Sequence, residues 1–164
     1  MKLIPITHEN VEQLAEIMAE LHSRAFTIAT PKGNESWGLE SILTSLSQKG
    51  VFAFLATSNE DIPMGFVLGR AVGANDKYDG EGEILTIAVD PANQGRGYGQ
   101  QLLQQAIVKA RKVGAKKMYL EVACDNDGAI GLYNKIGFKK IARRKDYYVR
   151  TTAVVDALVM EKSI

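Results

Sequence analysis

The sequence predicts an α/β (α+β) fold in which a mixed central sheet is flanked by four helices. The apolar pattern along the 164 residues gives the order strand, two helices, three strands, helix, strand, helix and two strands. Residues 83–122 form a strand, a helix and a second strand, and such a unit makes a right-handed parallel crossover. The 46% hydrophobic content is enough for one core, so residues 1–164 are expected to form a single domain.

Short elements with clear turn signals fill the first half of the chain. Residues 11–21 carry apolar side chains at helical spacing, and Pro31 and Gly33 mark a loop before a second helix. The expected elements are a strand at residues 2–6, a helix at 11–21, a loop at 27–36, a helix that Ser36 caps and that carries Leu39, Ile42, Leu43 and Leu46, and a hairpin of strands at 51–57 and 62–72. Trp37 begins the second helix, where a half-buried packing position is the commoner role for this residue.

The second half begins with a polar segment bounded by glycines, residues 73–82, which is expected to be a surface loop. The strand at 83–89 is apolar at nearly every position, which predicts burial on both faces. A helix from Tyr98 to a stop at Gly114, a strand at 117–122, a helix at 127–136 and an antiparallel pair at 138–144 and 153–161 complete the fold. The loop of that last pair is expected to contain Tyr147, Tyr148 and Arg150.

The composition excludes several classes of function. The net charge is +1 with acidic and basic residues nearly balanced, so neither a nucleic-acid partner nor a membrane surface is indicated. The apolar runs are too short to cross a bilayer and the first residues lack an apolar signal core, so a cytoplasmic location is expected. Cys124 is the single cysteine and lies far in sequence from His8 and His22, so neither a metal site nor a Cys–His nucleophile is indicated.

A glycine-rich segment precedes the helix that begins at Tyr98. It reads QGRGYG from Gln94 to Gly99, and the unpaired N–H groups of a first helical turn can bind phosphate. The P-loop pattern fails, because Gln100 and Gln101 stand where Lys and Ser or Thr are needed. The dinucleotide fingerprint fails as well, because its third glycine would fall at Gln100. A plain turn without a ligand is the alternative interpretation.

A second segment, residues 120–138, favours the phosphate interpretation. It reads LEVACDNDGAIGLYNKIGF, with a Leu-Glu-Val strand, Asn126, a Leu-Tyr pair and a Gly-Phe end. Together with Q-x-x-G-x-G, these elements, their order and their separation resemble the GNAT superfamily of acyl-CoA N-acyltransferases. From residue 83 to the end, the chain is most similar to the bacterial ribosomal-protein-alanine N-acetyltransferases of that superfamily, the RimI type, whereas the first half matches more loosely.

The resemblance implies a cofactor site. In the GNAT fold the parallel pair of strands is splayed around the cofactor, which is acetyl-CoA as co-substrate, and no metal takes part. The strand at 87–89 would hold the acetyl and pantetheine groups through its backbone, the glycine-rich segment would hold the pyrophosphate, and Asn126 would bond to the pantetheine arm. The cofactor-binding residues implied in this way are Ile87, Ala88, Val89, Gln94, Gly95, Arg96, Gly97, Tyr98, Gly99, Gln100, Asn126 and Tyr133.

Two residues would carry the catalysis. A protein α-amine has a reference pKa of about 8, so acetyl transfer at neutral pH needs a group that accepts its proton. Glu121 lies near the end of an otherwise apolar strand, where burial would make a carboxylate a stronger base, although a solvated sheet face is the alternative. In the family this Glu accepts the proton, directly or through water. Tyr133, which could otherwise be a core aromatic, would give a proton to the departing thiolate.

The resemblance implies a protein N-terminus as the acceptor, namely the N-terminal alanine of ribosomal protein S18. The amine would attack directly in a ternary complex, leaving coenzyme A and no covalent enzyme intermediate, on a protein that is a monomer or a weak dimer. The acidic residues from Asp76 to Glu83 are expected to attract a basic N-terminus. In the family the region of the first two helices lines the acceptor side, so the resemblance implies contact with the acceptor as a second interpretation of Trp37. The alternatives are a small-molecule amine as acceptor, such as a polyamine, amino sugar or amino acid, and a non-catalytic acyl-CoA-binding module.

Overall fold

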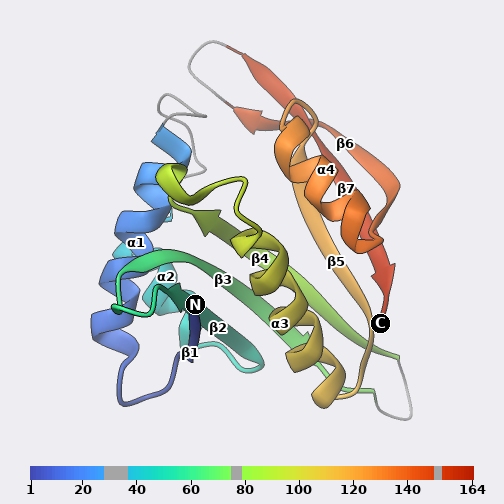
Figure 1. The fold of residues 1–164 in the computed structure, drawn as a ribbon. Coiled ribbons are helices and arrows are strands. Elements are labelled where there is room, and N and C mark those ends of the chain that lie inside the picture. The colour runs from blue at the N-terminus through green and yellow to red at the C-terminus, as the bar shows by residue number, and fades with distance from the viewer. Residues whose placement is uncertain (28–36, 75–78, 150–152) are drawn as a thin grey trace.

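The computed structural model describes residues 1–27, 37–74, 79–149 and 153–164. The elements follow the predicted order (Figure 1). They are β1 (Lys2–Pro5), α1 (Val11–Thr27), α2 (Leu39–Leu46), β2 (Val51–Thr57), β3 (Pro63–Val72), β4 (Gly80–Val89), a 3-10 turn (Pro91–Asn93), α3 (Tyr98–Lys112), β5 (Ala115–Ala123), α4 (Asp127–Ile136), β6 (Lys139–Val149) and β7 (Val154–Ser163). The loop expected at 27–36 lies, beyond Thr27, outside the described residues, as does Arg150.

Within the described residues, seven strands form one mixed sheet in the order β1-β2-β3-β4-β5-β7-β6. β4 and β5 are parallel, whereas every other neighbouring pair is antiparallel. α3 connects the parallel pair, and β7 lies between β5 and β6. The predicted fold class, a mixed sheet with a parallel pair and four flanking helices, is therefore confirmed. In the described part of the chain, no helix is both long and apolar enough to cross a membrane.

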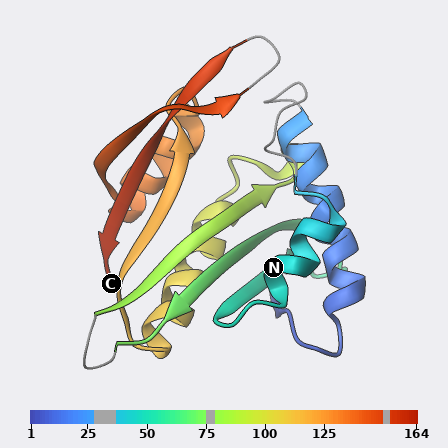
Figure 2. The same cartoon turned by 180° about the vertical axis from the view of Figure 1, so that it is seen from behind.

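Helices pack on both faces of the sheet. Side chains alternate along β2, so that Phe52 and Phe54 join a core cluster with α3, while Ala53 and Leu55 join a second cluster with α1 and α2. We call these sides the α3 face and the α1 face, and Figures 1 and 2 show them from opposite directions. α1 and α2 pack on β2, β3 and β4, and in the described part of the chain no helix lies over β5, β6 and β7 on the α1 face (Figure 2).

β4 has an irregularity at Leu85. The residues on either side of Leu85 pair with consecutive residues of β3, so Leu85 is an extra residue, a β-bulge. On the other edge of β4, pairing with β5 runs from Gly80 to Ile84 and ends there. Beyond Ile84 the two parallel strands diverge, as Figure 2 shows. This divergence is the predicted splay of the parallel pair.

Several predicted element bounds are wrong, among them the start of α2, which begins at Leu39 and not at Trp37, the start of β4 and the end of β6. β4 begins at Gly80, so residues 80–82 belong to the strand and not to the expected loop. Gly82 allows this close packing, because a Cβ there would lie only 2.5 Å from the sulfur of Met118. β6 continues to Val149, so Tyr147 and Tyr148 lie on the strand, whereas a loop was expected. In both places the chain continues a ladder with a neighbouring strand, and pairing of this kind is not visible in local sequence.

Candidate active site

The turn between β4 and α3 is held by its own side chains. The Asp90 carboxylate accepts a hydrogen bond from the Ala92 N–H at 2.9 Å, and Gln94 Nε2 donates to the Val89 carbonyl at 3.1 Å. Arg24, near the end of α1, forms an ion pair with Asp90 at 3.1 Å. The glycine-rich segment therefore starts from a turn that is fixed both to β4 and to α1.

The glycine-rich segment leads into the first turn of α3. Gly95 and Gly97 have φ angles of +74° and +86°, a region that strains other residues, and no atom lies within 4 Å of the place a Cβ would take at either one. Gly97 directly precedes α3, and no side chain caps the helix. Gln94, Gly95, Arg96 and Gly97 are exposed, and Tyr98, Gly99 and Gln100 are half-buried. Uncapped N–H groups in open space suit an anion such as phosphate.

The last residues of β4, Ile87, Ala88 and Val89, form one side of the splay. Their backbone pairs with β3 on one edge, while among the described residues no strand pairs with the edge that faces β5. Ala88 is buried, whereas Ile87 and Val89 are only half-buried, so the predicted burial on both faces is incomplete. Backbone groups on such an edge can hydrogen-bond an extended ligand in the manner of an added strand.

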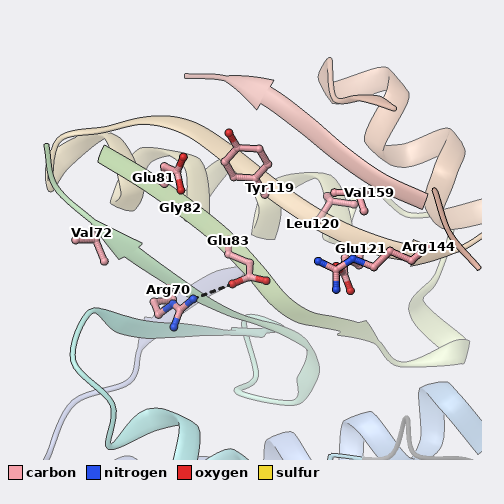
Figure 3. A pocket seen from close by; sticks show the side chains of 10 residues that line it. All are labelled: Arg70, Val72, Glu81, Gly82, Glu83, Tyr119, Leu120, Glu121, Arg144 and Val159. Atoms are coloured by element: carbon pink, nitrogen blue, oxygen red, sulfur yellow. Dashed lines mark hydrogen bonds and ion pairs between the residues drawn. The ribbon is translucent and has the colours of Figure 1, made fainter. Parts of the chain in front are cut away.

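Glu121 lies on β5 and faces a groove on the α1 face (Figure 3). The groove has a volume of about 610 Å³ and is lined by Arg70, Val72, Glu81, Gly82, Glu83, Tyr119, Leu120, Glu121, Arg144 and Val159. The Glu121 side chain is 20% exposed, and its Oε1 lies 3.1 Å from Nε of Arg144. The carboxylate is thus neither in the apolar core nor on a fully solvated sheet face.

Sequence reasoning did not single out the residues that contact Glu121. Besides Arg144, the Tyr147 hydroxyl hydrogen-bonds to Glu121, and this bond, together with burial, raises the pKa of Tyr147. Both residues come from β6, which reaches Glu121 because it lies beside β7, the strand paired with β5. The only signal for them in the sequence is the basic and aromatic run at residues 143–148.

The acidic residues that were expected to attract an acceptor do not all lie in the same place. Asp76 lies outside the described residues, and Asp79 is exposed just before β4. Glu81 and Glu83 are on β4 and line the groove, where Glu83 pairs with Arg70 at 3.2 Å (Figure 3). Part of this acidic charge therefore lies on the same groove as Glu121.

Tyr133 lies on α4 and is buried on the α3 face, with 5% of its surface exposed. Its ring packs edge-on against Phe138, with 6.1 Å between the ring centroids, in the cluster that contains Leu120 and Val122 of β5. Burial raises the pKa of Tyr133 to about 12, because the phenolate would carry its charge among apolar groups. The hydroxyl therefore keeps its proton at neutral pH and can act as a donor.

Asn126 has a structural role. It caps α4, where its Oδ1 accepts a hydrogen bond from the Ala129 N–H at 3.1 Å, and the helix spans the predicted residues up to Gly137. Because the oxygen accepts the capping bond, its second lone pair and the amide N–H groups of the side chain are the groups that can serve a ligand.

Glu121 and Tyr133 lie on opposite faces of β5. Leu120 and Val122, the neighbours of Glu121, are in the core cluster of Tyr133, and alternation along the strand turns Glu121 to the other side. A reacting group held between the diverging strands would therefore have a carboxylate on one side and a phenol on the other. The described residues contain no group of three or more His, Cys, Asp or Glu side chains that could hold a metal ion.

Known proteins share this architecture and parts of this sequence. The model of the acetyltransferase (GNAT) family matches residues 12–138. The N-alpha-acetyltransferase RimI of Mycobacterium tuberculosis is 47% identical over 68 residues, 42% of this chain and 41% of that protein. The ribosomal protein bS18-alanine N-acetyltransferase of Escherichia coli is 39% identical over 80 residues, 49% of this chain and 54% of that protein. Each match thus spans about half the length of the curated relative, or less.

The fold is shared over nearly the whole chain. The crystal structure of the ribosomal-protein-S18-alanine N-acetyltransferase from Escherichia coli superposes with a TM-score of 0.76, covering 99% of this chain and 93% of that one at 23% identity. The family model includes the β4 turn, the glycine-rich segment, Glu121 and Tyr133. Because the model matches most of the sequence, the chain belongs to the acetyltransferase (GNAT) family.

Proposed function

We propose that this protein transfers the acetyl group of acetyl-CoA to the N-terminal α-amine of a protein, with the N-terminal alanine of ribosomal protein S18 as acceptor. The observation that carries the proposal is the splay of β4 from β5, with Glu121 in a groove on one face and Tyr133 buried on the other. Two relatives are an N-alpha-acetyltransferase and a ribosomal-protein-alanine N-acetyltransferase. An acceptor of this kind would place the reaction in the cytoplasm.

The residues present fit acetyl-CoA, the substrate that GNAT enzymes use. Open space above Gly95 and Gly97 and the uncapped first turn of α3 suit the pyrophosphate. The free edge of β4 at Ile87, Ala88 and Val89 suits the amides of the pantetheine arm, which can pair with it like a strand. One N–H of that edge would stabilise the negative charge on the acetyl oxygen.

The two titratable residues divide the proton transfers between them. Acetyl-CoA supplies the activated acyl group, whose C–S bond breaks as the amine nitrogen bonds to the carbonyl carbon. Glu121 accepts the proton of the α-ammonium group, directly or through a water in the groove. Tyr133 donates its hydroxyl proton to the sulfur that leaves and then regains a proton from solvent. The nitrogen gives up its second proton to water as the amide forms. Two protons thus leave the nitrogen, one ends on the thiol of coenzyme A and one is released overall, and no bond to the enzyme forms.

The groove supports a protein N-terminus as the acceptor. It is open along β3, β4, β5 and β7, so a chain that continues beyond the reacting amine has room on the α1 face. Glu81 and Glu83 give this groove acidic charge that favours the approach of a basic segment. The encounter rate with a basic peptide is therefore expected to fall as salt concentration rises.

The direct test is acetyl-CoA turnover against a panel of acceptors. The panel contains peptides that begin with Ala, Ser, Met or Gly on the S18 sequence, together with spermidine and an aminoglycoside. Turnover confined to the Ala-starting ribosomal peptide, and reduced in both Tyr133→Phe and Glu121→Gln, is the expected result. The two variants show whether turnover by the wild-type protein depends on the proposed acid and base.

Other outcomes separate the parts of the proposal. Turnover of spermidine or the aminoglycoside alone would keep the cofactor site and the acid but would rule out the protein acceptor. Binding of acetyl-CoA without turnover of any acceptor would favour an acyl-CoA-binding module.

A further inference from the structure

β6 departs from a regular ladder near the groove. Arg144 pairs with Ala157 of β7 and Tyr148 pairs with Val155, so three residues of β6 face the single residue Asp156. We call residues 145–147 the β6 bulge. Asp146, at its centre, has a φ of +54°, a left-handed conformation that Asp tolerates better than most residues.

Asp156 holds the β6 bulge in place. One of its carboxylate oxygens, Oδ1, accepts a hydrogen bond from the Asp146 N–H at 2.9 Å, and the other, Oδ2, accepts one from Nε of Arg143. Both bonds lower the pKa of Asp156, and the bond from the Asp146 N–H has the larger effect. The carboxylate therefore stays ionised at neutral pH and continues to bind the left-handed turn.

The β6 bulge brings two side chains to Glu121. Residues three apart point to opposite faces of a regular strand, so Arg144 and Tyr147 would diverge without the extra residues. In the structure both contact Glu121, Arg144 through its Nε at 3.1 Å and Tyr147 through its hydroxyl. They also contact each other, because Cζ of Arg144 lies 5.5 Å from the centre of the Tyr147 ring. We call Arg144 and Tyr147 the Glu121 clamp.

Among residues 1–27, 37–74, 79–149 and 153–164, few other charged or titratable groups share the groove with Glu121. Those on the same groove are Arg70 on β3, Glu81 and Glu83 on β4, and Tyr119 on β5. Arg70 pairs with Glu83, and the Tyr119 hydroxyl hydrogen-bonds to Glu161. The Glu121 clamp therefore provides the contacts that the structure gives to the carboxylate itself.

We propose that Asp156 is a positioning residue, which acts through the β6 bulge to keep the Glu121 clamp on the catalytic carboxylate. The proposal rests on the proposed function, because it takes Glu121 as the proton acceptor. Asp156 is not among the residues that line the groove, and the hydrogen bonds of its carboxylate go to Asp146 and Arg143. Asp156 is therefore expected to affect catalysis by positioning Arg144 and Tyr147. A double-mutant cycle can test this dependence.

The experiment measures kcat/KM for the amine acceptor in four proteins: wild type, Asp156→Ala, the clamp variant Arg144→Ala/Tyr147→Phe, and the triple variant. Asp156→Ala is expected to lower kcat/KM by about 10-fold in the wild type and by less than about 2-fold when the clamp is absent, because the effect is transmitted by the clamp. KM for acetyl-CoA is expected to stay unchanged. Equal losses in the two backgrounds would show that Asp156 acts in another way and would overturn the proposal.

Two further measurements keep the result interpretable. The amide hydrogen of Asp146 is expected to exchange slowly in wild type and in the clamp variant, and fast in Asp156→Ala. Melting temperatures are measured for all four proteins, and the kinetics are run well below the lowest of them. Lys140→Ala, an exposed position on β6 outside the bulge, is the matched control and is expected to retain wild-type kinetics.

The failures of the two proposals can be told apart. The acceptor in the assay is whichever amine the wild-type protein turns over, so the cycle does not depend on S18. If Glu121→Gln keeps full activity, the assignment of Glu121 as base falls, and the positioning role of Asp156 falls with it. If Glu121→Gln is impaired but the cycle is additive, only the positioning role falls.

Discussion

The two faces of the sheet are built differently, although each supplies one residue of the proposed chemistry. On the α3 face, Tyr133 is buried among apolar side chains of α3, α4 and β5. On the α1 face, none of the described helices covers β5, and Glu121 lies in a groove with Arg144 and Tyr147. Around β5, therefore, the α3 face excludes water and the α1 face admits it, and this exclusion of water is why the pKa of Tyr133 is raised.

This difference matches what the two proton transfers require. A proton donor has to remain protonated until the sulfur leaves, and the pKa of about 12 of Tyr133 ensures this at any ordinary pH. A proton acceptor has to return its proton to solvent in each turnover, which a groove open to water permits. We therefore expect the pH dependence of the protein near neutrality to originate on the α1 face.

The largest effect is expected from Tyr133→Phe. It removes the hydroxyl and keeps the ring that packs against Phe138, so kcat should fall about 1,000-fold, or about 4 kcal/mol, while the melting temperature changes little. Steady-state kinetics and thermal denaturation of the same preparation measure both quantities. If Tyr133→Phe retained the wild-type kcat, Tyr133 would not be the proton donor, and the α3 face would supply no catalytic residue.

The second largest effect is expected on the free energy of unfolding, and it comes from His22 on the α1 face. His22 is 1% exposed, stacks on Phe26 and accepts a hydrogen bond from the Trp37 N–H at 3.2 Å. Burial lowers the pKa of His22 from 6.5 to about 4, so its contribution is complete above pH 6.5 and is lost as the pH falls toward 4. Over that range, stability should decrease by about 3 kcal/mol.

The measurement is urea unfolding at a series of pH values. His22→Asn keeps an acceptor near the Trp37 N–H but cannot be protonated, so this loss between pH 6.5 and 4 should disappear. The same change at the exposed His8 is the matched control and should leave the loss in place. An identical pH dependence in wild type and His22→Asn would contradict the assignment.

A smaller effect is expected from Glu121→Gln, which keeps the shape of the base but removes its ability to accept a proton. At pH 7 kcat/KM for the acceptor should fall about 30-fold. The defect should shrink above pH 8, because an α-amine with a pKa of about 8 then loses its proton without help. A pH profile of wild type and variant tests this, and a constant ratio of the two across the range would speak against a role as base.

The smallest effect compares two glycines that have open space around them. Gly97→Ala forces a side chain into a φ of +86° beside the first turn of α3, at a cost of about 1 kcal/mol, and should raise KM for acetyl-CoA about 5-fold. Gly131→Ala, in the middle of α4, should leave that KM unchanged and stabilise the helix slightly. Equal KM values in the two variants would argue against binding at the glycine-rich segment.

Much of the fold could be predicted because its signals are local. α4 begins after Asn126 and ends at Gly137 as expected, since a capping side chain and a glycine act within one turn. The strand β2 and its hairpin follow from a short apolar run and a polar turn. Trp37 is half-buried against the core cluster of the α1 face, which agrees with the commoner of its two interpretations.

The contacts of the candidate site could not be predicted to the same depth. Arg144 and Glu121 are far apart in sequence, and their ion pair depends on the insertion of β7 between β5 and β6 and on the β6 bulge. Likewise, Gly80 and Gly82 are typical of a loop, and only their pairing with β3 and β5 makes them part of a strand. Such long-range pairings leave no pattern in neighbouring residues.

The bulge at Leu85 also matters for anyone who redesigns the acceptor preference of this protein. Before the bulge, odd-numbered Glu83 lies on the α1 face and even-numbered Ile84 on the α3 face. After it, even-numbered Ala88 lies on the α1 face and odd-numbered Ile87 on the α3 face. A library that varies every second position along β4 would therefore switch, halfway along the strand, from remodelling one face to disrupting the core of the other.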